Sequence, residues 1–193
     1  MIAPHERPAA GPAAAMAAAM QAGIPAIETA RLRLRAPRIE DFALYAEIAI
    51  SPRGLGLFGE TPSRRDVWRD FAQMVATWIL RGHGVWTVET REGGAPLGFI
   101  LLGFEAGDHE PELGYVFAES AEGRGFAREA AEAALAHGRE ALALPALVST
   151  IEPGNRRSIR LAERLGGARD RAAEAAHGNR VRVYRYEIGE NCA

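Results

Sequence analysis

The order in which helical and extended patterns follow one another constrains this chain more than any single motif does. Between Ile27 and Arg35, apolar residues alternate with arginines, and this period of two predicts a half-buried strand. Further strands are predicted at 85–90, 97–103, 112–117, 147–151 and 181–188, and helices near 39–49, 63–79, 126–140 and 155–166. The resulting order, β-α-α-β-β-β-α-β-α-β, predicts an α/β chain with one continuous core and no internal repeat.

The composition fits a single domain. The chain has 193 residues, of which 48% are hydrophobic and 25% charged, so it can bury a sizeable core. Its formal charge of -2 lacks the basic excess of a nucleic-acid-binding protein, so no DNA partner is expected. The only cysteine, Cys192, excludes an intrachain disulfide and a cysteine zinc site and favours a reducing cytoplasm. Because no apolar run reaches about 18 residues, no membrane partner is expected either.

The two ends of the chain differ from the rest. Residues 1–26 are rich in alanine and proline, and their longest alanine run is broken only by Met16. This run lacks the leucine-rich centre of a secretory signal. We interpret 1–26 as a loosely held extension with room for one short helix, although a natural translation start at Met16 or Met20 explains the segment equally well. The predicted domain covers 27–188, and a tail follows at 189–193.

Several familiar motifs are absent or lie in the wrong setting. The string Gly54-Leu-Gly-Leu-Phe-Gly59 matches a dinucleotide-binding pattern, but it follows a helical segment instead of a strand, so we do not assign it that role. No phosphate-loop NTPase string and no zinc-protease string occurs. The five histidines are scattered along the chain, so no metal site is predicted.

The segment that indicates chemistry runs from Glu122 to Ala130, where a predicted strand leads through a glycine-bearing loop into the start of a helix. Gly123 and Gly125 allow the backbone to turn its N–H groups outward, and a helix start adds roughly half a positive charge. Such a turn suits a phosphate or pyrophosphate; the alternative is a plain turn before a surface helix. Arg124 and Arg128 are candidate countercharges, or else solvated residues on the helix surface.

Three blocks of sequence give the chain a resemblance to a known family. They are Glu28-Thr-Ala-Arg-Leu-Arg-Leu-Arg, Glu112-Leu-Gly-Tyr followed by Gly-Arg-Gly-Phe-Ala-Arg-Glu-Ala, and Glu152-Pro-Gly-Asn-Arg-Arg-Ser-Ile-Arg-Leu-Ala-Glu-Arg-Leu-Gly. From about Ile27 to Ile188 the chain resembles the GCN5-related N-acetyltransferases (GNAT), most closely the RimJ/RimL-type branch. The resemblance implies an α/β (α+β) fold with a mixed, mostly antiparallel sheet of about six to seven strands flanked by about four helices.

The same resemblance implies the reaction. An acetyl group would pass from acetyl-CoA to a primary amine, either a protein N-terminal α-amine or the amine of a small molecule, by direct attack in a ternary complex. No metal takes part in this chemistry, and a homodimer is compatible with it.

Cofactor contacts follow from the family motif residue by residue. Glu122 to Ala127 occupy the place of the acetyl-CoA motif R/Q-x-x-G-x-G/A, but the first position is a glutamate, and a carboxylate cannot donate to pyrophosphate. The loop must then rely on backbone amides from about Gly123 to Arg128. The family's splayed strand, which pairs with the pantetheine arm, corresponds to Tyr115–Phe117. The cofactor-binding residues implied are Tyr115, Val116, Phe117, Glu122, Gly123, Arg124, Gly125, Phe126, Ala127, Arg128, Asn155 and Ser158.

Two residues of the helix near 155–166 have alternative roles. Asn155 matches the family asparagine that binds pantetheine, and it is also a good helix N-cap. Ser158 matches the residue proposed to protonate the departing thiolate, and its alternative is a first-turn hydroxyl bonded to the backbone. Many family members carry a tyrosine four residues after this serine, where this chain has Ala162.

The amine must lose a proton, so a base is expected. Glu112 is our candidate, acting directly or through water, with a plain surface carboxylate as the alternative and His109 as the second choice. We expect the acceptor site to be built from the loop at 53–60 and the hairpin at 177–180, with Glu60 and Glu119 available to attract a cation. A non-catalytic acyl-CoA-binding module with the same fold is the competing function.

Overall fold

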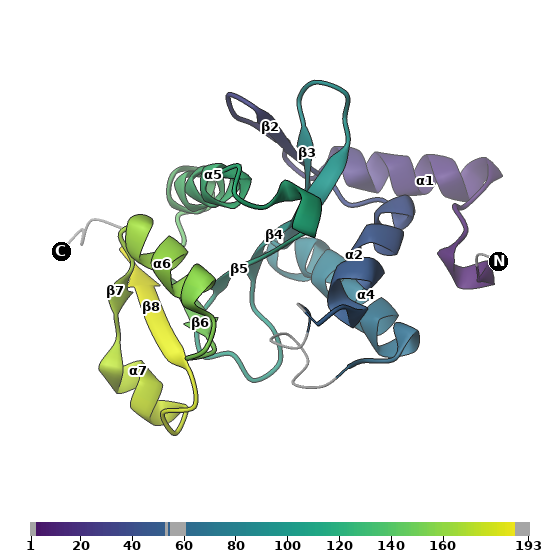
Figure 1. Cartoon of the computed structure of the whole chain (residues 1–193). Helices are drawn as coiled ribbons and strands as arrows, with labels where there is room; N and C mark the ends of the chain where they lie inside the picture. The colour runs from purple at the N-terminus through teal and green to yellow at the C-terminus, as the bar shows by residue number, and fades with distance from the viewer. Residues whose placement is uncertain (1–2, 53, 55–60, 188–193) are drawn as a thin grey trace.

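The computed structural model describes residues 3–52, 54 and 61–187, and a mixed sheet forms the centre of this part of the chain (Figure 1). Its strands are β1 (Ile27–Glu28), β2 (Leu32–Arg35), β3 (Val85–Thr90), β4 (Pro96–Gly103), β5 (Glu112–Phe117), β6 (Leu147–Ile151), β7 (Ala168–Arg169) and β8 (Arg182–Tyr186). They lie in the order β1-β2-β3-β4-β5-β6-β8-β7, and β5 with β6 is the one parallel pair among the described residues. The expected mixed, mostly antiparallel sheet is confirmed, with eight strands, slightly more than expected.

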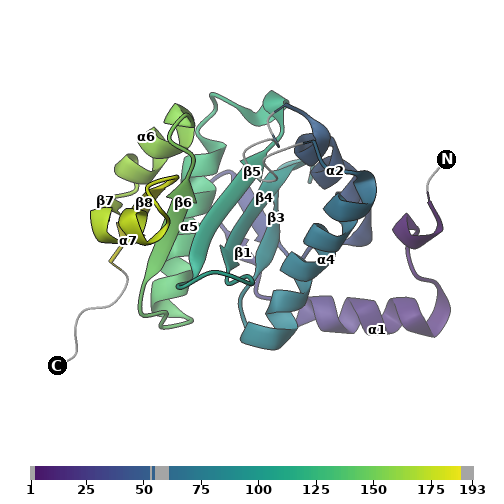
Figure 2. The same cartoon turned by 90° about the horizontal axis from the view of Figure 1, so that it is seen from below.

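Helices cover both faces of this sheet (Figure 2). They are α1 (Gly11–Ala22), α2 (Phe42–Ile50), α4 (Arg64–Arg81), α5 (Phe126–Glu140), α6 (Arg156–Arg164) and α7 (Arg171–Ala176). Strand alternation explains the two layers: Val85 and Phe99 join the core under α2 and α4, whereas Trp86 and Ile100 join the core under α5. Ala162 of α6 belongs to the second core, so α5 and α6 share one face of the sheet.

Two regions of the sheet differ from the sequence-based expectation. The segment predicted as one strand between Ile27 and Arg35 forms a hairpin of two strands, β1 and β2, in which Ile27 pairs with Leu34 and Glu28 with Arg33. Residues 168–176 form β7 and α7, where the sequence pattern predicts no element. Strand β7 has two residues and helix α7 has six, so neither is long enough to show a hydrophobic period in the sequence.

The N-terminal extension contains the twelve-residue helix α1, which buries no side chain. Two contacts join the segment before α1 to α4: the ring of His5 lies 4.9 Å from that of Trp68, and Arg64 donates to Glu6 at 2.7 and 2.9 Å. After α1, the indole N–H of Trp86 donates to the carbonyl of Pro25 at 2.8 Å. The extension is therefore held at both ends, and α1 extends away from the sheet between them (Figure 2).

The second predicted helix buries a narrower stripe than expected. In α4, Val67, Phe71, Met74 and Trp78 are buried at helical spacing. Ile79 ends the apolar pattern that predicts the helix near 63–79, and it is 72% exposed. Each residue turns about 100° around a helix, so the position after Trp78 already lies outside the buried face.

Arg35 is buried, although the alternation predicts an exposed arginine at this position. Its guanidinium donates to Glu89 at 2.5 Å and to both carboxylate oxygens of Asp41, at 2.7 and 2.9 Å. The hydroxyl of Thr87 and the N–H of Arg38 donate to the same aspartate, at 2.8 and 2.7 Å. Burial raises the pKa of Asp41, but the hydrogen bonds from Arg35 and its neighbours outweigh burial and hold that pKa below its ordinary value. The buried arginine is thus neutralised by two carboxylates.

We expect Asp41→Asn to destabilise the fold by about 3 kcal/mol, because it removes one of two buried countercharges of Arg35. The Asp41 carboxylate makes its full contribution to folding stability above its ordinary pKa of 3.8. This contribution is lost as the pH falls through the pKa of Asp41 in the folded protein, which is lower. Urea unfolding at neutral and acid pH should therefore show the two proteins converging in acid. The exposed neighbour Glu40 supplies the control, Glu40→Gln, and equal small effects of both changes would contradict the network.

Candidate functional site

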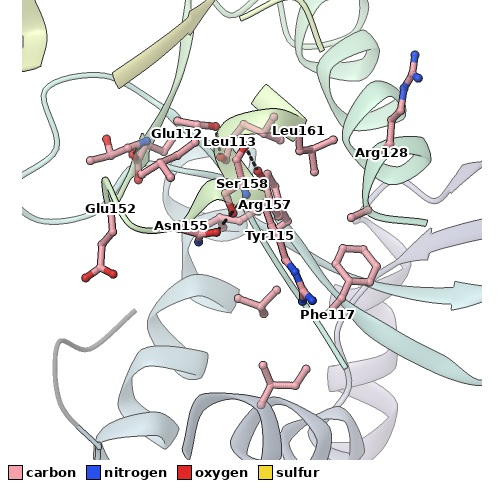
Figure 3. Close-up of a pocket in the computed structure, with 18 of the residues that line it drawn as sticks. Glu112, Leu113, Tyr115, Phe117, Arg128, Glu152, Asn155, Arg157, Ser158 and Leu161 are labelled. Carbon is pink, nitrogen blue, oxygen red and sulfur yellow. Dashed lines mark hydrogen bonds between the residues drawn. The ribbon is translucent and has the colours of Figure 1, made fainter. Parts of the chain in front are cut away.

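A groove opens where β5 leaves β6. The two strands share one backbone bridge, between Glu112 and Val148, whereas β5 pairs with β4 over six positions. The groove has a volume of about 1170 Å³ and is lined by β5, by the glycine loop that follows it, and by α2, α4, α5 and α6 (Figure 3). This exceeds the usual volume of a small-ligand pocket and leaves room for two substrates.

The free edge of β5 presents backbone groups to the groove. The N–H of Ala118 donates to the carbonyl of Leu97 on the β4 side at 2.9 Å. By the alternation of an antiparallel pair, the backbone groups of Tyr115 and Phe117 point away from β4, toward the gap. Those of Val116 face β4, although Val116 itself lines the groove. The splayed strand expected at 115–117 is thus present, with two of its three residues offering free backbone groups.

The glycine loop directs N–H groups into the same groove. Gly123 and Gly125 have φ angles of 71° and 78°, in the left-handed region that glycine tolerates best. Within the described ranges, no N–H of residues 123–128 donates a hydrogen bond to the protein. The last three of these donors lie in the first turn of α5, which is fifteen residues long. The arrangement suits a phosphate group.

Long-range hydrogen bonds hold this loop in place. Glu129, in the first turn of α5, accepts from the hydroxyl of Thr29 at 2.6 Å and from the N–H and Nε of Arg31 at 2.9 and 2.7 Å. Arg31 also donates to the carbonyl of Arg124 at 2.9 Å, and its guanidinium lies 4.8 Å from the ring centre of Phe126. Because these partners are 93 to 100 residues apart, no local sequence signal identifies them.

The charged side chains predicted around the loop have different environments. Glu122 accepts from Arg157 of α6 at 2.6 Å, so its charge is matched by an arginine. Arg128 lines the groove and donates to Glu132, one turn further along α5, at 2.8 Å. Arg124 does not line the groove, because its guanidinium stacks on the aromatic ring two residues later, 4.5 Å from the ring centre. Of the two predicted countercharges, the structure brings only Arg128 to the groove.

The start of α6 supplies two further polar groups (Figure 3). The Oδ1 atom of Asn155 accepts the N–H of Ser158 at 3.1 Å, so the asparagine caps the helix. Its amide nitrogen has no protein partner in the described residues, so capping leaves a donor for a ligand. Ser158 contacts Tyr115 of β5 in two ways. The hydroxyl of Tyr115 donates to the carbonyl of Ser158 at 3.3 Å, and a side-chain hydrogen bond with Ser158 partly opposes the rise that burial causes in the pKa of Tyr115. Ala162 is fully buried, which leaves no room for the family tyrosine.

The other end of the groove is acidic. Tyr45 of α2 donates to Asp70 of α4, and Glu105 and Asp108 lie in the loop between β4 and β5. Burial raises the pKa of Asp70. Burial, together with the neighbouring carboxylates of Asp70, Asp108 and Glu112, raises the pKa of Glu105 to about 7. This end therefore holds a carboxyl group that titrates near neutral pH.

Glu112 lies between these two ends. It shares its strand face with Val116, which packs toward α2 and α4, whereas Tyr115 packs into the core under α5. Burial raises the pKa of Glu112, although the N–H of Thr150 donates to its Oε1 at 2.7 Å and opposes that shift. The groove thus passes through the sheet, with Ser158 on one face and the acidic end on the other.

Several residues expected at the acceptor site lie elsewhere. The rings of His109 and His177 are 5.8 Å apart, and neither these nor Glu119 line the groove. The predicted loop at 53–60, including Glu60, lies outside the described residues apart from one glycine. The acidic end of the groove comes from α2, α4 and the β4–β5 loop, and its carboxylates meet only in the folded chain.

Two negative findings concern the described residues alone. No three of their His, Cys, Asp or Glu side chains are grouped in a way that could hold a metal ion. None of the described helices is long and apolar enough to cross a membrane.

Known proteins resemble this chain in sequence or in fold. An acetyltransferase of known structure from Agrobacterium tumefaciens str. C58 is 38% identical, with a TM-score of 0.80 over 85% of this chain and 95% of that one. An uncharacterized N-acetyltransferase, p20, from Bacillus licheniformis is 30% identical over 83% of this chain and 93% of its own. RimL, a ribosomal L7/L12 α-N-protein acetyltransferase solved with coenzyme A, shares the fold at 17% identity, with a TM-score of 0.67 over 85% of this chain and 98% of its own.

A family model described as the acetyltransferase (GNAT) domain matches residues 31–168. This range contains every described residue that lines the groove. The chain therefore belongs to the GNAT family of acetyltransferases.

Proposed function

We propose that this acyltransferase moves an acetyl group from acetyl-CoA to a primary amine by direct attack, with both substrates bound in the groove. One observation carries the proposal: a single groove joins a loop of unpaired N–H groups on one face of the sheet to a cluster of carboxylates on the other. The first end suits the phosphates of a nucleotide cofactor, and the second suits a cationic amine. RimL, which shares the fold, has been solved with coenzyme A.

Separate groups of described residues suit the pyrophosphate and the pantetheine arm of acetyl-CoA. The pyrophosphate would accept from the N–H groups of residues 123–128, with Arg128 as a countercharge. The amides of the pantetheine arm would pair with the free backbone groups of Tyr115 and Phe117 and with the side-chain amide of Asn155. With these contacts, the thioester would lie near the bridge between Glu112 and Val148, where β5 and β6 separate.

The chemistry balances without a covalent enzyme intermediate. The neutral amine nitrogen attacks the thioester carbonyl and forms the C–N bond, and the C–S bond breaks. The thiolate takes a proton from the hydroxyl of Ser158, and solvent water returns a proton to the serine oxygen. The amine proton passes to the coupled carboxylates Glu112 and Glu105. Glu105, with its pKa near 7, is the member of this pair that sequence reasoning missed.

The pKa of the acceptor amine sets the free energy that is needed to make it neutral at pH 7. Making a lysine-type amine neutral at pH 7 costs about 4.6 kcal/mol, whereas an α-amine with a pKa near 7.8 costs about 1.1 kcal/mol. A base that titrates near 7 is well matched to the second group, so it favours an α-amine over a lysine. The three sequence blocks around Arg31, Gly125 and Asn155 support the RimJ/RimL-type branch, and the single cysteine supports a reducing cytoplasm.

The proposal predicts release of free coenzyme A thiol when acetyl-CoA is mixed with a suitable amine. A panel of peptides with free α-amines, lysine side chains with blocked α-amines, and small amines should separate the acceptor classes. Acetyl-CoA alone should raise the free energy of unfolding, by about 2.7 kcal/mol at one hundred times its dissociation constant. Stabilisation without thiol release from any amine would instead support the non-catalytic binding module.

Ser158→Ala should lower kcat while leaving the affinity for acetyl-CoA within about threefold, because a proton donor to the leaving thiolate matters most in the transition state. Steady-state kinetics and calorimetry on the same preparation measure both quantities. Ser120→Ala, in an exposed turn outside the groove, is the matched control. A fall in affinity as large as the fall in kcat would show that Ser158 only binds the cofactor.

The pH dependence should report the coupled carboxylates. In the wild type we expect kcat/KM to rise as the pH rises through about 7, since Glu105 becomes a carboxylate there. Glu105→Gln should remove the part of this rise near pH 7 and leave the rise through the pKa of the acceptor amine itself. Glu112→Gln should move it to lower pH, because it removes one of the charges that raise the pKa of Glu105.

The control for this pair is Glu47→Gln, on the exposed side of α2, which should leave the profile unchanged. Losses that do not depend on pH in both Glu105→Gln and Glu112→Gln would exclude the pair as the base and leave positioning as its role.

A further inference from the structure

Helix α6 carries a concentration of positive charge along the groove. Its nine residues include four arginines and a single acidic residue. Arg157, Arg160 and Arg164 are spaced i, i+3 and i+7, which places them on one face of the helix, and all three line the groove. Arg156 does not line it. The basic face spans about two helical turns beyond the capping residue.

Of the three arginines of α6 that line the groove, one forms an ion pair with another described residue. Arg157 donates to Glu122 of the glycine loop at 2.6 Å. Arg160 and Arg164 have no ionic or hydrogen-bonded partner in the part of the chain that the structure describes. Arg128, on the α5 side of the same groove (Figure 3), is paired with Glu132. The uncompensated charge is therefore concentrated at Arg160 and Arg164.

We propose that Arg160 and Arg164 form a separate phosphate subsite, which binds the 3′-phosphate on the ribose of coenzyme A. This inference rests on the proposed use of acetyl-CoA. The unpaired N–H groups of residues 123–128 already account for the two bridging phosphates. Coenzyme A carries a third, a phosphomonoester with about two negative charges, and two neighbouring guanidinium groups suit such a dianion.

The charges of the groove support this placement. The acidic end, with Asp70, Glu105 and Asp108, would repel a phosphate and lies on the opposite face of the sheet from α6. The glycine loop pairs with α6 through Glu122 and Arg157, so a ligand bound by the loop lies next to the helix. Arg160 and Arg164 follow one and two turns after Arg157, toward the C-terminal end of α6, where a positive charge is also favourable.

Calorimetry with coenzyme A and 3′-dephospho-coenzyme A tests the subsite, since the two ligands share the pyrophosphate and differ only in the third phosphate. For the full-length wild type we expect about tenfold tighter binding of coenzyme A at low ionic strength, falling with added salt. In the double variant Arg160→Gln/Arg164→Gln this preference should fall to about twofold, with the affinity for the dephospho ligand almost unchanged. Arg156→Gln removes the same charge from a position of α6 that does not line the groove, and it should keep the preference.

The possible results separate this inference from the function on which it rests. Equal wild-type affinities for the two ligands would overturn the subsite and leave the acetyl-CoA proposal intact. An equal loss for both ligands in the double variant would assign the arginines to the pyrophosphate and overturn the subsite too. Loss of the preference in Arg156→Gln would show that the preference comes from the total positive charge of α6 and not from a subsite at Arg160 and Arg164. Failure of the wild type to bind either ligand would remove the proposed function itself. Thermal unfolding of each variant confirms that it is folded.

Discussion

The single bridge between β5 and β6, at Glu112 and Val148, is the constraint on which the site depends. Parallel strands that pair along their length leave no free backbone groups, whereas these two separate after one residue. The separation leaves the edge of β5 open at Tyr115 and Phe117 and lets the groove pass from one face of the sheet to the other. In the proposed reaction, a cofactor and an acceptor amine would approach the same point from opposite sides, so no covalent intermediate would be needed to connect them.

The glycine loop illustrates how such a site is made ready before a ligand arrives. Positive φ angles at Gly123 and Gly125 set the direction of the N–H groups, but glycines alone would leave the loop free to change shape. Glu129 and Arg31 remove that freedom, because they join the first turn of α5 to the turn between β1 and β2, 98 residues earlier in the chain. The donors therefore keep one arrangement, which lowers the ordering cost of binding.

Charge is divided between the two ends of the groove in a chain whose formal net charge is only -2. Arg160 and Arg164 lie with the glycine loop, and Asp70 and Glu105 lie across the sheet from them. Under the proposed function, each end would repel the substrate of the other, so the division of charge would favour one orientation of the two substrates. Close packing of carboxylates also has a chemical effect, since it raises the pKa of Glu105 into the range where a base works at neutral pH.

The sequence by itself determined the main strands and helices, the glycine loop and the cap at Asn155, because each depends on residues close together in the chain and leaves a periodic or turn signal. The tertiary structure alone decided three other features: the burial of Arg35, the hold of Arg31 on the loop, and the carboxyl group at Glu105 that titrates near neutral pH. Arg35 looks like any exposed arginine of an alternating strand until Glu89, 54 residues away, lies beside it. Partners at such separations leave no trace in local patterns, since burial and charge at a position are properties of whatever folds against it.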